Sequence, residues 1–438
     1  MAAMIGRGAQ RAPSGLDIML IRVAKAFWHL DRTIDQLGAH GVADAVQRRE
    51  LARRKLAHAL DDRLDQIGGR LGKALERRQL LDARDRLEHE QLFGGRCAEC
   101  HVFSLLCLAS SRCIGTNMPA SKPSDTQIMP ADDAAIGRAV AILREGRAVA
   151  LPTETVYGLA ADAARADAVA AIYRTKGRPD FNPLIVHVPD MDAARRLAVF
   201  DDRAEKLAQA FWPGPLTLVL PLANGAPVAA AVTAGLPTIA LRCPAHPVMR
   251  GVLTAGGMML AAPSANRSGG ISPTTAAHVA ASLGDAVPLI LDGGPCTAGL
   301  ESTIVALRNI AGAAAGWQLL RPGPIDPAEI AALLGEAPLP LTDHAIEAPG
   351  QLASHYAPSK PVRLGAAQAG PDEWLIGFGE VQGDDTLSAA GDLAEAAANL
   401  YAALHRADAS PRARIAVAPV PGDGMGAAIN DRLHRAAA

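Results

Sequence analysis

Lys176-Gly177-Arg178-Pro179 and the following Asn182-Pro183-Leu184-Ile185-Val186-His187-Val188 form the stretch that decides the fold. Residues 184–188 are apolar apart from one histidine and predict a short buried strand. The turn before the strand carries two cations and an amide, and polar groups at strand ends are typical of the ligand crevice in open α/β sheets. A lysine, a planar guanidinium and an amide together favour a polyphosphate bound beside a small polar substrate.

Four other polar clusters lie at the ends of predicted strands in the same region. Taken singly, each is also explained by a simpler role, such as a turn stabilised by Ser and Asn or a cation on the surface. His187 alone is likewise typical of a satisfied core residue. The recurrence of such clusters at strand ends within one domain indicates a shared site. The four clusters are Pro152-Thr153-Glu154-Thr155, Ser264-Ala265-Asn266, Glu301-Ser302-Thr303 and Arg321-Pro322-Gly323.

Helix and strand patterns alternate from Asp132 onwards, which predicts an α/β fold. The order of the elements is irregular, and this favours a twisted mixed sheet with flanking helices over a simple doubly wound sheet. The helix predicted at residues 274–283 is expected to be capped near Ser272, with Pro273 at its first position. Strands are predicted at residues 148–151, 184–188, 216–220, 239–242, 258–262, 289–291, 303–307 and 318–320. Helices are predicted at residues 132–145, 166–175, 191–197, 203–211, 246–253 and 274–283.

A linker and a small second α/β domain are predicted after this region. Residues 336–360 contain four prolines that interrupt regular structure. Beyond them, strands are predicted at 362–364, 374–378 and 415–420, with helices at 392–404 and 426–435. The chain therefore divides into an N-terminal segment (1–128), a larger domain (129–335), the linker (336–360) and a small domain (361–438).

The N-terminal segment has a different pattern and is expected to be helical or disordered. Leucines at helical spacing within residues 42–91 predict one or two amphipathic helices, which either bind a partner or RNA or form a charged solvated surface. A disordered leader over residues 119–130, behind an upstream start codon chosen in error, is a further interpretation. A zinc site also stays open, although the later two of four neighbouring cysteines lack CxxC spacing: Cys97, Cys100, Cys107 and Cys113.

Composition excludes several functional classes. The 438 residues are 49% hydrophobic, enough for two or three domains, and the net charge of −2 gives no global signature of nucleic-acid binding. No apolar run reaches the roughly 18 residues that a membrane-spanning helix needs, and six cysteines in so long a chain favour a reducing cytoplasm.

P-loop, HExxH and GxSxG motifs are absent, and Cys243 and Cys296 lack CxxC neighbours, so no protein nucleophile is assigned.

In this order along the chain, the polar clusters resemble the threonylcarbamoyl-AMP synthase family, which has the YrdC-like fold. The tail extends the likeness to the two-domain form of the family, which has a linker and a small Rossmann-like domain. The first 128 residues match nothing in that pattern. The matching segments are residues 152–159, 176–179, 182–187, 212–217, 241–242, 262–266, 301–303 and 320–323, with 354–358 in the linker and 430–433 in the last helix.

The resemblance implies a reaction and a set of roles. Threonine, bicarbonate and ATP would give threonylcarbamoyl-AMP and pyrophosphate, and a second enzyme would transfer the group to tRNA position 37. ATP would enter with Mg²⁺ held through its phosphates rather than by protein ligands. Thr153, His187 and Arg242 would surround the threonine, and Tyr356 would close over the site. The ATP side would comprise Lys176, Arg178, Asn182, Ser264, Asn266, Ser302, Arg321 and Tyr356.

Two alternatives remain open beside this synthase. The first is an RNA-binding module without catalysis, since YrdC-like folds have a basic concavity, and weak RNA binding is compatible with either reading. The second is a carbamoyl-transfer domain that uses carbamoyl phosphate. The Lys-Gly-Arg and Ser-Ala-Asn segments favour the synthase. Lys176 is expected to be a solvated cation whose removal leaves the fold intact.

Overall fold

The strands of the larger domain form one mixed sheet in the order β1-β8-β2-β3-β7-β4-β6-β5-β9-β10. The computed structural model describes residues 126–308, 316–340, 347–350 and 355–438. Residues Ser121–Ala438 form one unit. The strands are β1 (Gln127–Pro130), β2 (Val149–Leu151), β3 (Gly158–Asp162), β4 (Ile185–His187), β5 (Leu216–Pro221), β6 (Thr238–Arg242), β7 (Leu260–Ala261), β8 (Leu289–Asp292), β9 (Thr303–Arg308) and β10 (Gly316–Arg321).

Parallel and antiparallel pairings alternate irregularly across this sheet. β1 and β2 both run parallel to β8, β4 runs parallel to β6, and β5 runs parallel to β9. The remaining neighbours, such as β2 with β3 and β5 with β6, are antiparallel. This pairing confirms the predicted mixed sheet, because a doubly wound fold would have kept its strands parallel.

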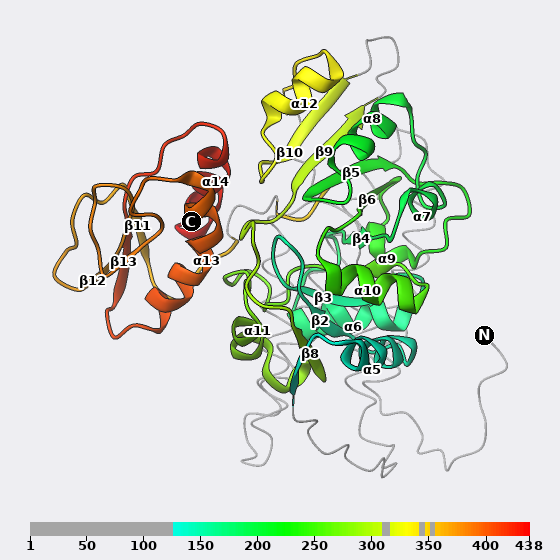
Figure 1. Ribbon diagram of the computed structural model, residues 1–438, viewed down its shortest axis with the longest axis horizontal. Helices are drawn as coiled ribbons and strands as arrows, with labels where there is room; N and C mark the ends of the chain where they lie inside the picture. The colour runs from blue at the N-terminus through cyan, green and yellow to red at the C-terminus, as the bar shows by residue number, and fades with distance from the viewer. Residues whose placement is uncertain (1–125, 309–315, 341–346, 351–354) are drawn as a thin grey trace, which may run out of the picture. The chain divides into compact units, whose positions relative to one another are not determined.

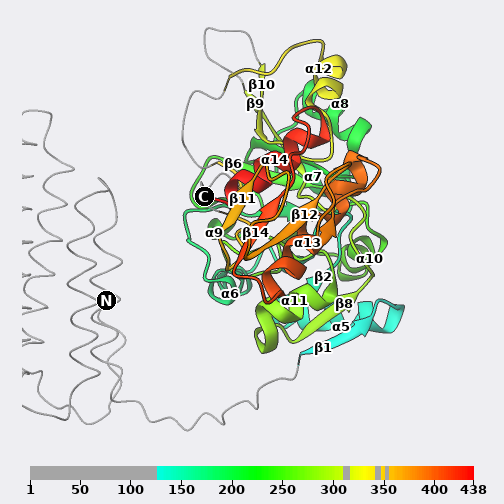
Figure 2. The same ribbon diagram turned by 90° about the vertical axis from the view of Figure 1, so that its left-hand side faces the viewer.

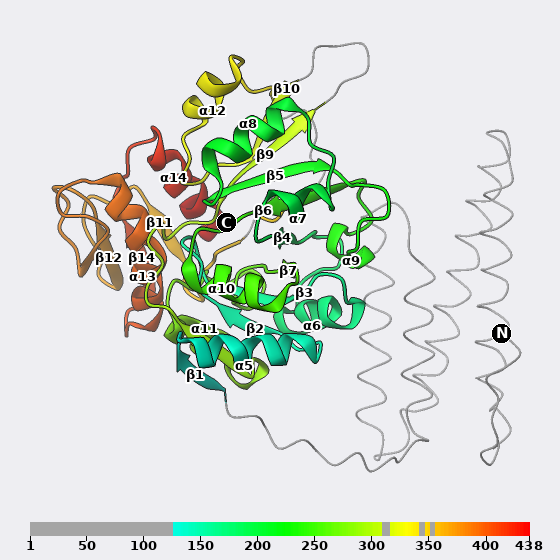
Figure 3. The same ribbon diagram turned by 45° about the vertical axis from the view of Figure 1, so that its right-hand side comes forward.

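Helices cover both faces of the first half of the sheet, as the alternation of strand side chains requires. In β2, Val149 and Leu151 pack in the core under α5 and α10, whereas Ala150 points into the core under α6 and α11. Figures 1 and 3 show α5 and α10 near one another, with α8 and α12 beside β9 and β10. The helices are α5 (Asp133–Arg144), α6 (Ala166–Lys176), α7 (Met191–Arg195), α8 (Asp202–Phe211), α9 (Ala230–Thr233), α10 (Pro247–Gly256), α11 (Ala276–Leu283) and α12 (Pro327–Leu334), with a 3-10 turn at Gly284–Ala286.

The second half of the sheet exposes one face to the linker instead of to a helix. Ile185 of β4, Val219 of β5 and Ile304 of β9 form a small core with Ala348, a linker residue. The polar strand ends of β4, β6 and β9 therefore lie under the linker. This arrangement is what brings linker residues to the site described below.

The C-terminal domain is a parallel four-stranded sheet in the order β11-β14-β12-β13. Ile376, Ile415 and Val417 point from the sheet into one core, to which α13 and α14 add their alanine and leucine faces. Figure 2 shows the two helices with β11, β12 and β14. The elements are β11 (Val362–Leu364), β12 (Glu373–Gly377), β13 (Asp385–Thr386), β14 (Arg414–Val417), α13 (Leu393–Ala409) and α14 (Met425–Ala436).

Several elements differ from the sequence predictions. β3 was missed because its sequence, Gly-Leu-Ala-Ala-Asp, has little β propensity, and pairing with β2 and β7 imposes the strand. α12 was missed although Asp326 caps it, Pro327 opens it and Gly335 ends it, which are local signals that the sequence does contain. The expected cap near Ser272 is wrong, since the Thr275 hydroxyl accepts from the His278 amide and α11 begins at Ala276.

β1 was also not predicted. Residues 127–130 were assigned to a disordered leader, but they pair in parallel with β8, and the Thr126 hydroxyl donates to Gly284 O and Val287 O. The amphipathic helices and the cysteine cluster predicted for the N-terminal segment lie outside the described residues. Within the residues that the structure does describe, no helix has the length and apolarity to cross a membrane.

Candidate active site

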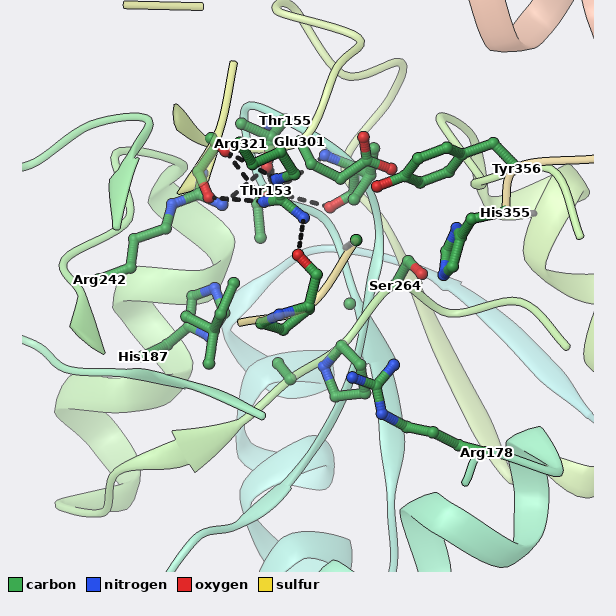
Figure 4. Close-up of a pocket in the computed structure, with 18 residues that line it drawn as sticks. Thr153, Thr155, Arg178, His187, Arg242, Ser264, Glu301, Arg321, His355 and Tyr356 are labelled. Atoms are coloured by element: carbon green, nitrogen blue, oxygen red, sulfur yellow. Dashed lines mark hydrogen bonds between the residues drawn. The ribbon is translucent and has the colours of Figure 1, made fainter. Parts of the chain in front are cut away.

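A cavity lies where the polar clusters meet beneath the linker. Figure 4 shows Arg242 and His187 on one side of it, His355 and Tyr356 on the other, and Ser264 between them. The lining includes ends of β4, β6 and β10 and the turns after β2 and β7. The polar lining residues are Thr153, Thr155, Arg178, His187, Arg242, Ser264, Glu301, Ser302, Arg321, His355 and Tyr356.

Arg242, the last residue of β6, is fixed on one side of the cavity. Its Nη2 lies 2.7 Å from Glu154 Oε1, its Nη1 donates to Thr155 Oγ1 at 2.8 Å, and its Nε donates to Gly214 O at 3.2 Å. The second carboxylate oxygen of Glu154 accepts from the backbone amides of Ala245 and His246. Burial alone would raise the pKa of Glu154, but Arg242 and these hydrogen bonds lower it. The pair therefore holds the Arg242 guanidinium in a fixed orientation at the cavity.

Arg178 follows the C-terminal end of α6, where Gly177 adopts a left-handed conformation with φ 61°. This conformation suits glycine and turns the chain towards β4. The buried guanidinium donates from Nε to Asn182 O at 3.1 Å and from Nη2 to Pro183 O at 2.8 Å. Burial lowers the pKa of Arg178 to about 10, so the side chain remains a cation at neutral pH. Arg178 thus lines the cavity as a positive charge bonded to neutral acceptors.

Arg321, at the end of β10, lines the nearby wall of the cavity. It donates from Nε and Nη2 to Ser302 O, from Nη2 to Ser302 Oγ at 3.1 Å, and from Nη1 to Pro349 O at 3.2 Å. Ser302 also shares a 2.7 Å hydrogen bond with Thr217 Oγ1. The arginine therefore joins β9, β10 and the linker, and all of these acceptors are neutral.

Lys176 is not the solvated cation that the sequence suggested. It is the last residue of α6, its side chain is 4% exposed, and Nζ donates to Ser264 O at 2.5 Å and Asn266 O at 2.6 Å. Burial, with a smaller contribution from Arg178, lowers the pKa of Lys176 well below its usual value. The prediction was wrong because a lysine at the end of a helix is usually exposed to solvent, whereas here the turn after β7 covers the end of α6. Lys176 fixes that turn from behind the lining.

Three neutral polar groups at the cavity are buried without a hydrogen-bond partner in the described part of the chain: His187 Nδ1, His355 Nδ1 and Tyr356 Oη. Burial lowers the pKa of both histidines to about 3, so both imidazoles are neutral at physiological pH. Buried polar atoms are almost always satisfied in folded proteins. Orphaned atoms that face one cavity therefore indicate a polar ligand.

Eight of the eleven predicted site residues line this cavity: Thr153, Arg178, His187, Arg242, Ser264, Ser302, Arg321 and Tyr356. The other three lie behind it. Lys176 and Asn266 belong to the turn contact described above, and Asn182 accepts from Arg178 through its carbonyl while its buried side-chain amide has no partner in the described residues. The structure therefore brings the eleven predicted residues into one region, with eight in the lining of the cavity and three behind it.

The sequence places Glu154 and Glu301 in two of the polar clusters but assigns neither a role, and Gly350 is not among the predicted site residues. Glu301 lines the cavity as a carboxylate among arginines, and its role among these charges depends on residues that are distant in the sequence. Gly350 has a φ of +88°, and a Cβ on it would meet Tyr356 Oη at 2.7 Å. The signal for Gly350 was present in Pro349-Gly350, a turn dipeptide that was counted only as part of the linker.

The cavity has a volume of about 40 Å³, which is room for a few water molecules and far less than the usual volume of a ligand pocket. The linker residues Pro349, Gly350, His355 and Tyr356 form its cover. Its walls carry more buried cations than carboxylates. The cavity is therefore a narrow site under the linker, suited to an anionic ligand.

The fold and the site together define a class: a two-domain α/β protein with a linker folded over a cation-lined cavity at the strand ends of a YrdC-like sheet. A family model described as telomere recombination (Sua5, YciO and YrdC) matches residues 141–323, and a model of the threonylcarbamoyl-AMP synthase C-terminal domain matches residues 325–438. The chain belongs to the threonylcarbamoyl-AMP synthase family.

Individual relatives agree with this placement. Threonylcarbamoyl-AMP synthase of Bacillus subtilis is 38% identical over 338 residues, covering 71% of this chain and 95% of that protein. The Pyrococcus abyssi protein of the same name is 37% identical over 323 residues, covering 68% and 92%. The crystal structure of P. abyssi Sua5 complexed with L-threonine superposes with a TM-score of 0.65 at 35% identity, covering 72% of this chain and 97% of that one.

Proposed function

We propose that this chain converts L-threonine, bicarbonate and ATP into threonylcarbamoyl-AMP and pyrophosphate. The observation that carries the proposal is the set of orphaned polar atoms, His187 Nδ1, His355 Nδ1 and Tyr356 Oη, around a cavity walled by arginines. The family placement and the threonine complex of the P. abyssi relative support threonine as the amino acid. The product would feed threonylcarbamoyladenosine modification of tRNA position 37 in the cytoplasm, through a separate transferase.

Arg178, Ser264, Ser302 and Arg321 would hold the triphosphate. Two guanidiniums bonded to neutral groups retain their charge for an anion, and hydroxyls add hydrogen bonds at fixed positions. Lys176 and Asn266 would support this side by fixing the turn that presents Ser264, and Asn182 by its contact with Arg178. Their contribution is positional, because none of the three lines the cavity.

Thr153, His187 and Arg242 would surround the threonine. Arg242 offers a cation to the carboxylate, and the neutral Nδ1 of His187 can accept a hydrogen bond from the amine. The Glu154 carboxylate holds Arg242 in place. An amine that is hydrogen-bonded to a neutral imidazole retains the lone pair with which it must attack the carbon of bicarbonate or carbon dioxide.

Magnesium would enter with ATP. In the described ranges, no group of three or more His, Cys, Asp or Glu could hold a metal ion, so the phosphates would supply most of its ligands. When bound, the ion would neutralise charge that grows on the phosphate oxygens as pyrophosphate leaves. The residues of the chain would orient the carbamate oxygen in line with the α-phosphate.

The cover formed by the linker explains how an unstable carbamate could survive. Threonine carbamate hydrolyses readily in water, so the intermediate has to be shielded until it attacks the α-phosphate. His355 and Tyr356 are buried and lie over the cavity, and Pro349 O accepts from Arg321. A cavity of about 40 Å³ is too small for ATP, so the linker would move aside for the nucleotide and return over it in each turnover.

Pyrophosphate release tests the proposal directly. Release should require ATP, threonine and bicarbonate together, and omission of any one should abolish it. An RNA-binding module would release no pyrophosphate under any combination, and a carbamoyl-transfer domain would respond to carbamoyl phosphate in place of threonine and bicarbonate. Serine in place of threonine measures how closely the site reads the methyl group, for which we expect a loss of roughly 10- to 200-fold in kcat/KM.

A further inference from the structure

Glu301, which comes just before β9, is a carboxylate in the wall of a cavity proposed to hold a triphosphate. Its side chain is bound on three sides. Ser272 Oγ donates to Oε1 at 2.6 Å, Tyr401 Oη lies 2.9 Å from Oε2, and Arg432 Nε donates to Oε2 at 2.9 Å. Ser272 belongs to the larger domain, whereas Tyr401 lies on α13 and Arg432 on α14. The C-terminal domain therefore supplies two of the three partners of this carboxylate.

The backbone of the two domains also comes close at this point. Gly299, with a φ of +67°, is packed so that a Cβ would lie 2.4 Å from Ala398 Cα and 2.5 Å from Ala397 O, both on α13. Arg432 is fully buried, and its guanidinium carbon lies 5.4 Å from the centre of the Tyr356 ring. Arg432 thus contacts both the carboxylate of Glu301 and the residue that covers the cavity.

Glu301 is ionised and close to the phosphate side of the site. Burial would raise its pKa, but Arg432, Arg321 and the hydrogen bond from Ser272 outweigh burial and lower the pKa to about 2. Its neighbour Ser302 is the residue to which Arg321 is bonded. A carboxylate at this place, if left uncompensated, would either repel a phosphate or draw Arg321 away from it.

We propose that Arg432, and to a lesser degree Tyr401, are positioning residues for nucleotide binding. They hold the Glu301 carboxylate towards the C-terminal domain and neutralise its charge, which leaves Arg321 to act on the phosphates. This inference rests on the proposed function, because it assumes that the anion near Arg321 is a nucleotide. It assigns the C-terminal domain a direct electrostatic part in a site that the larger domain and the linker otherwise build.

A purely structural role makes a different prediction. If Arg432 only joined the two domains, its loss would lower the melting temperature and affect ATP and threonine alike. If Arg432 neutralises Glu301, the loss should fall on ATP, and removal of the carboxylate charge should reverse it. The charge-removal variant is available because Arg432 Nη1 also pairs with Asp431 at 2.8 Å, so Glu301→Gln does not leave the arginine without a partner.

The experiment compares Arg432→Met, Arg432→Lys, Glu301→Gln and the double variant Arg432→Met/Glu301→Gln with the full-length wild type. In Arg432→Met, KM for ATP should rise roughly tenfold or more, while KM for threonine changes less than about twofold. Arg432→Lys retains the charge and should recover most of the loss. In the double variant, KM for ATP should return to within about threefold of wild type. Tyr401→Phe removes one donor and should shift KM for ATP by only about two- to threefold.

Arg363→Met is the matched control. Arg363 is also an arginine of the C-terminal domain, and it pairs with both oxygens of Glu373 on β12, away from the lining of the cavity. We expect unchanged kinetics in this variant. A single Arg432→Met variant that keeps the wild-type KM for ATP would overturn the inference, and so would a double variant as impaired as the single one. If Arg432→Met does not fold, the other two variants test the inference. Glu301→Gln should bind ATP at least as tightly as wild type, and weaker ATP binding by this variant would count against the inference. Tyr401→Phe should show the small increase in KM for ATP given above.

Calorimetric binding of ATP separates this inference from the proposed function. A wild type that binds ATP but releases no pyrophosphate with threonine and bicarbonate would overturn the proposed function, and the binding constants of the variants would still decide the role of Arg432. A wild type that does not bind ATP would overturn both. Selective loss of ATP binding in Arg432→Met, with rescue in the double variant, would support the inference whichever reaction follows.

Discussion

The Lys176 ammonium donates to the carbonyl oxygen of Ser264 at 2.5 Å, across 88 residues of sequence. A second bond from the same Nζ reaches Asn266 O. The two segments that the sequence singled out as phosphate-binding are thus joined to each other through a buried lysine. This contact sets the position of Ser264, which lines the cavity.

Lys176→Met should therefore both destabilise the protein and abolish pyrophosphate release. Two buried carbonyls would lose their donor, at a cost of roughly 1–3 kcal/mol each in the free energy of unfolding. Denaturant unfolding and the pyrophosphate assay measure the two effects. Lys206→Met, a change at an exposed lysine of α8, serves as the control and should alter neither. An undisturbed free energy of unfolding in Lys176→Met would show that the contact with Ser264 contributes nothing.

Glu154→Gln should raise KM for threonine by about tenfold and leave KM for ATP nearly unchanged. The substitution keeps the shape of the side chain but removes the negative charge that orients Arg242 at 2.7 Å. The ratio of the two KM values is the measurement. Equal changes in both constants would argue against a role of Arg242 on the threonine side. Glu205→Gln, which removes a carboxylate from the surface pair with Arg195, is a control that should have no effect on either constant.

Gly350→Ala should lower turnover more than it lowers stability. Its Cβ would stand 2.7 Å from Tyr356 Oη and 2.9 Å from Arg321 Cδ, at a φ of +88°. The linker could then not lie flat over the cavity, and threonine carbamate would be lost to water. We expect kcat to fall by roughly 10- to 100-fold, because carbamate that is lost before it attacks the α-phosphate gives no product and consumes no ATP. A wild-type kcat for pyrophosphate release in a Gly350→Ala variant that is as stable as wild type would contradict this account of the cover. Tyr356→Phe should have a similar but smaller effect, because only the hydroxyl is lost.

Stability should fall as the pH is lowered from about 6.5 to 4. His278 of α11 stacks on His405 of α13, with ring centroids 4.0 Å apart, and His405 Nε2 lies 3.2 Å from Ser272 O. Burial, His405 and Arg406 lower the pKa of His278 to about 4, and burial lowers that of His405 despite the opposing effects of Ser272 and Asp408. Between the folded and unfolded pKa values the unfolded chain binds more protons, so acid favours unfolding.

The stacked pair accounts for part of this dependence, beside the buried His187 and His355. His405→Gln can keep the bond to Ser272 O while removing the titrating ring. Its melting temperature should accordingly fall less than that of wild type between pH 7 and pH 5. If the melting temperatures of wild type and His405→Gln fall equally between pH 7 and pH 5, then the histidines at this interface do not take up protons when the protein unfolds.

Two truncations test where the folded unit begins. Removal of residues 1–120 should leave pyrophosphate release and the melting temperature of the remaining unit unchanged. Removal of residues 1–130 also deletes β1, which pairs with β8 from Gln127↔Leu289 to Pro130↔Asp292, and should cost roughly 1–3 kcal/mol of stability. Equal stability of the two truncated proteins would mean that β1 is dispensable. Loss of folding in the shorter deletion would show that the N-terminal segment is required.

Much of the architecture could be read from the sequence, since periodicity is a local property. The helices at α6 and α13 and the strands at β5, β6 and β9 fall where their apolar patterns placed them. β3 could not be predicted in this way, because its strand conformation comes from its neighbours and not from its own residues. α12 could have been predicted from its caps.

The sequence by itself determined which chemical groups this protein brings to its site, because hydroxyls, guanidiniums and amides recur in short motifs at predictable strand ends. Only the tertiary structure decided how those groups are used. It buried Lys176 behind the turn instead of in solvent, paired Arg242 with Glu154, and placed Arg432 of the C-terminal domain on Glu301. Each of these depends on the burial of a charge beside a partner that lies far away in the chain, and burial is a property of the packed whole that no local pattern contains.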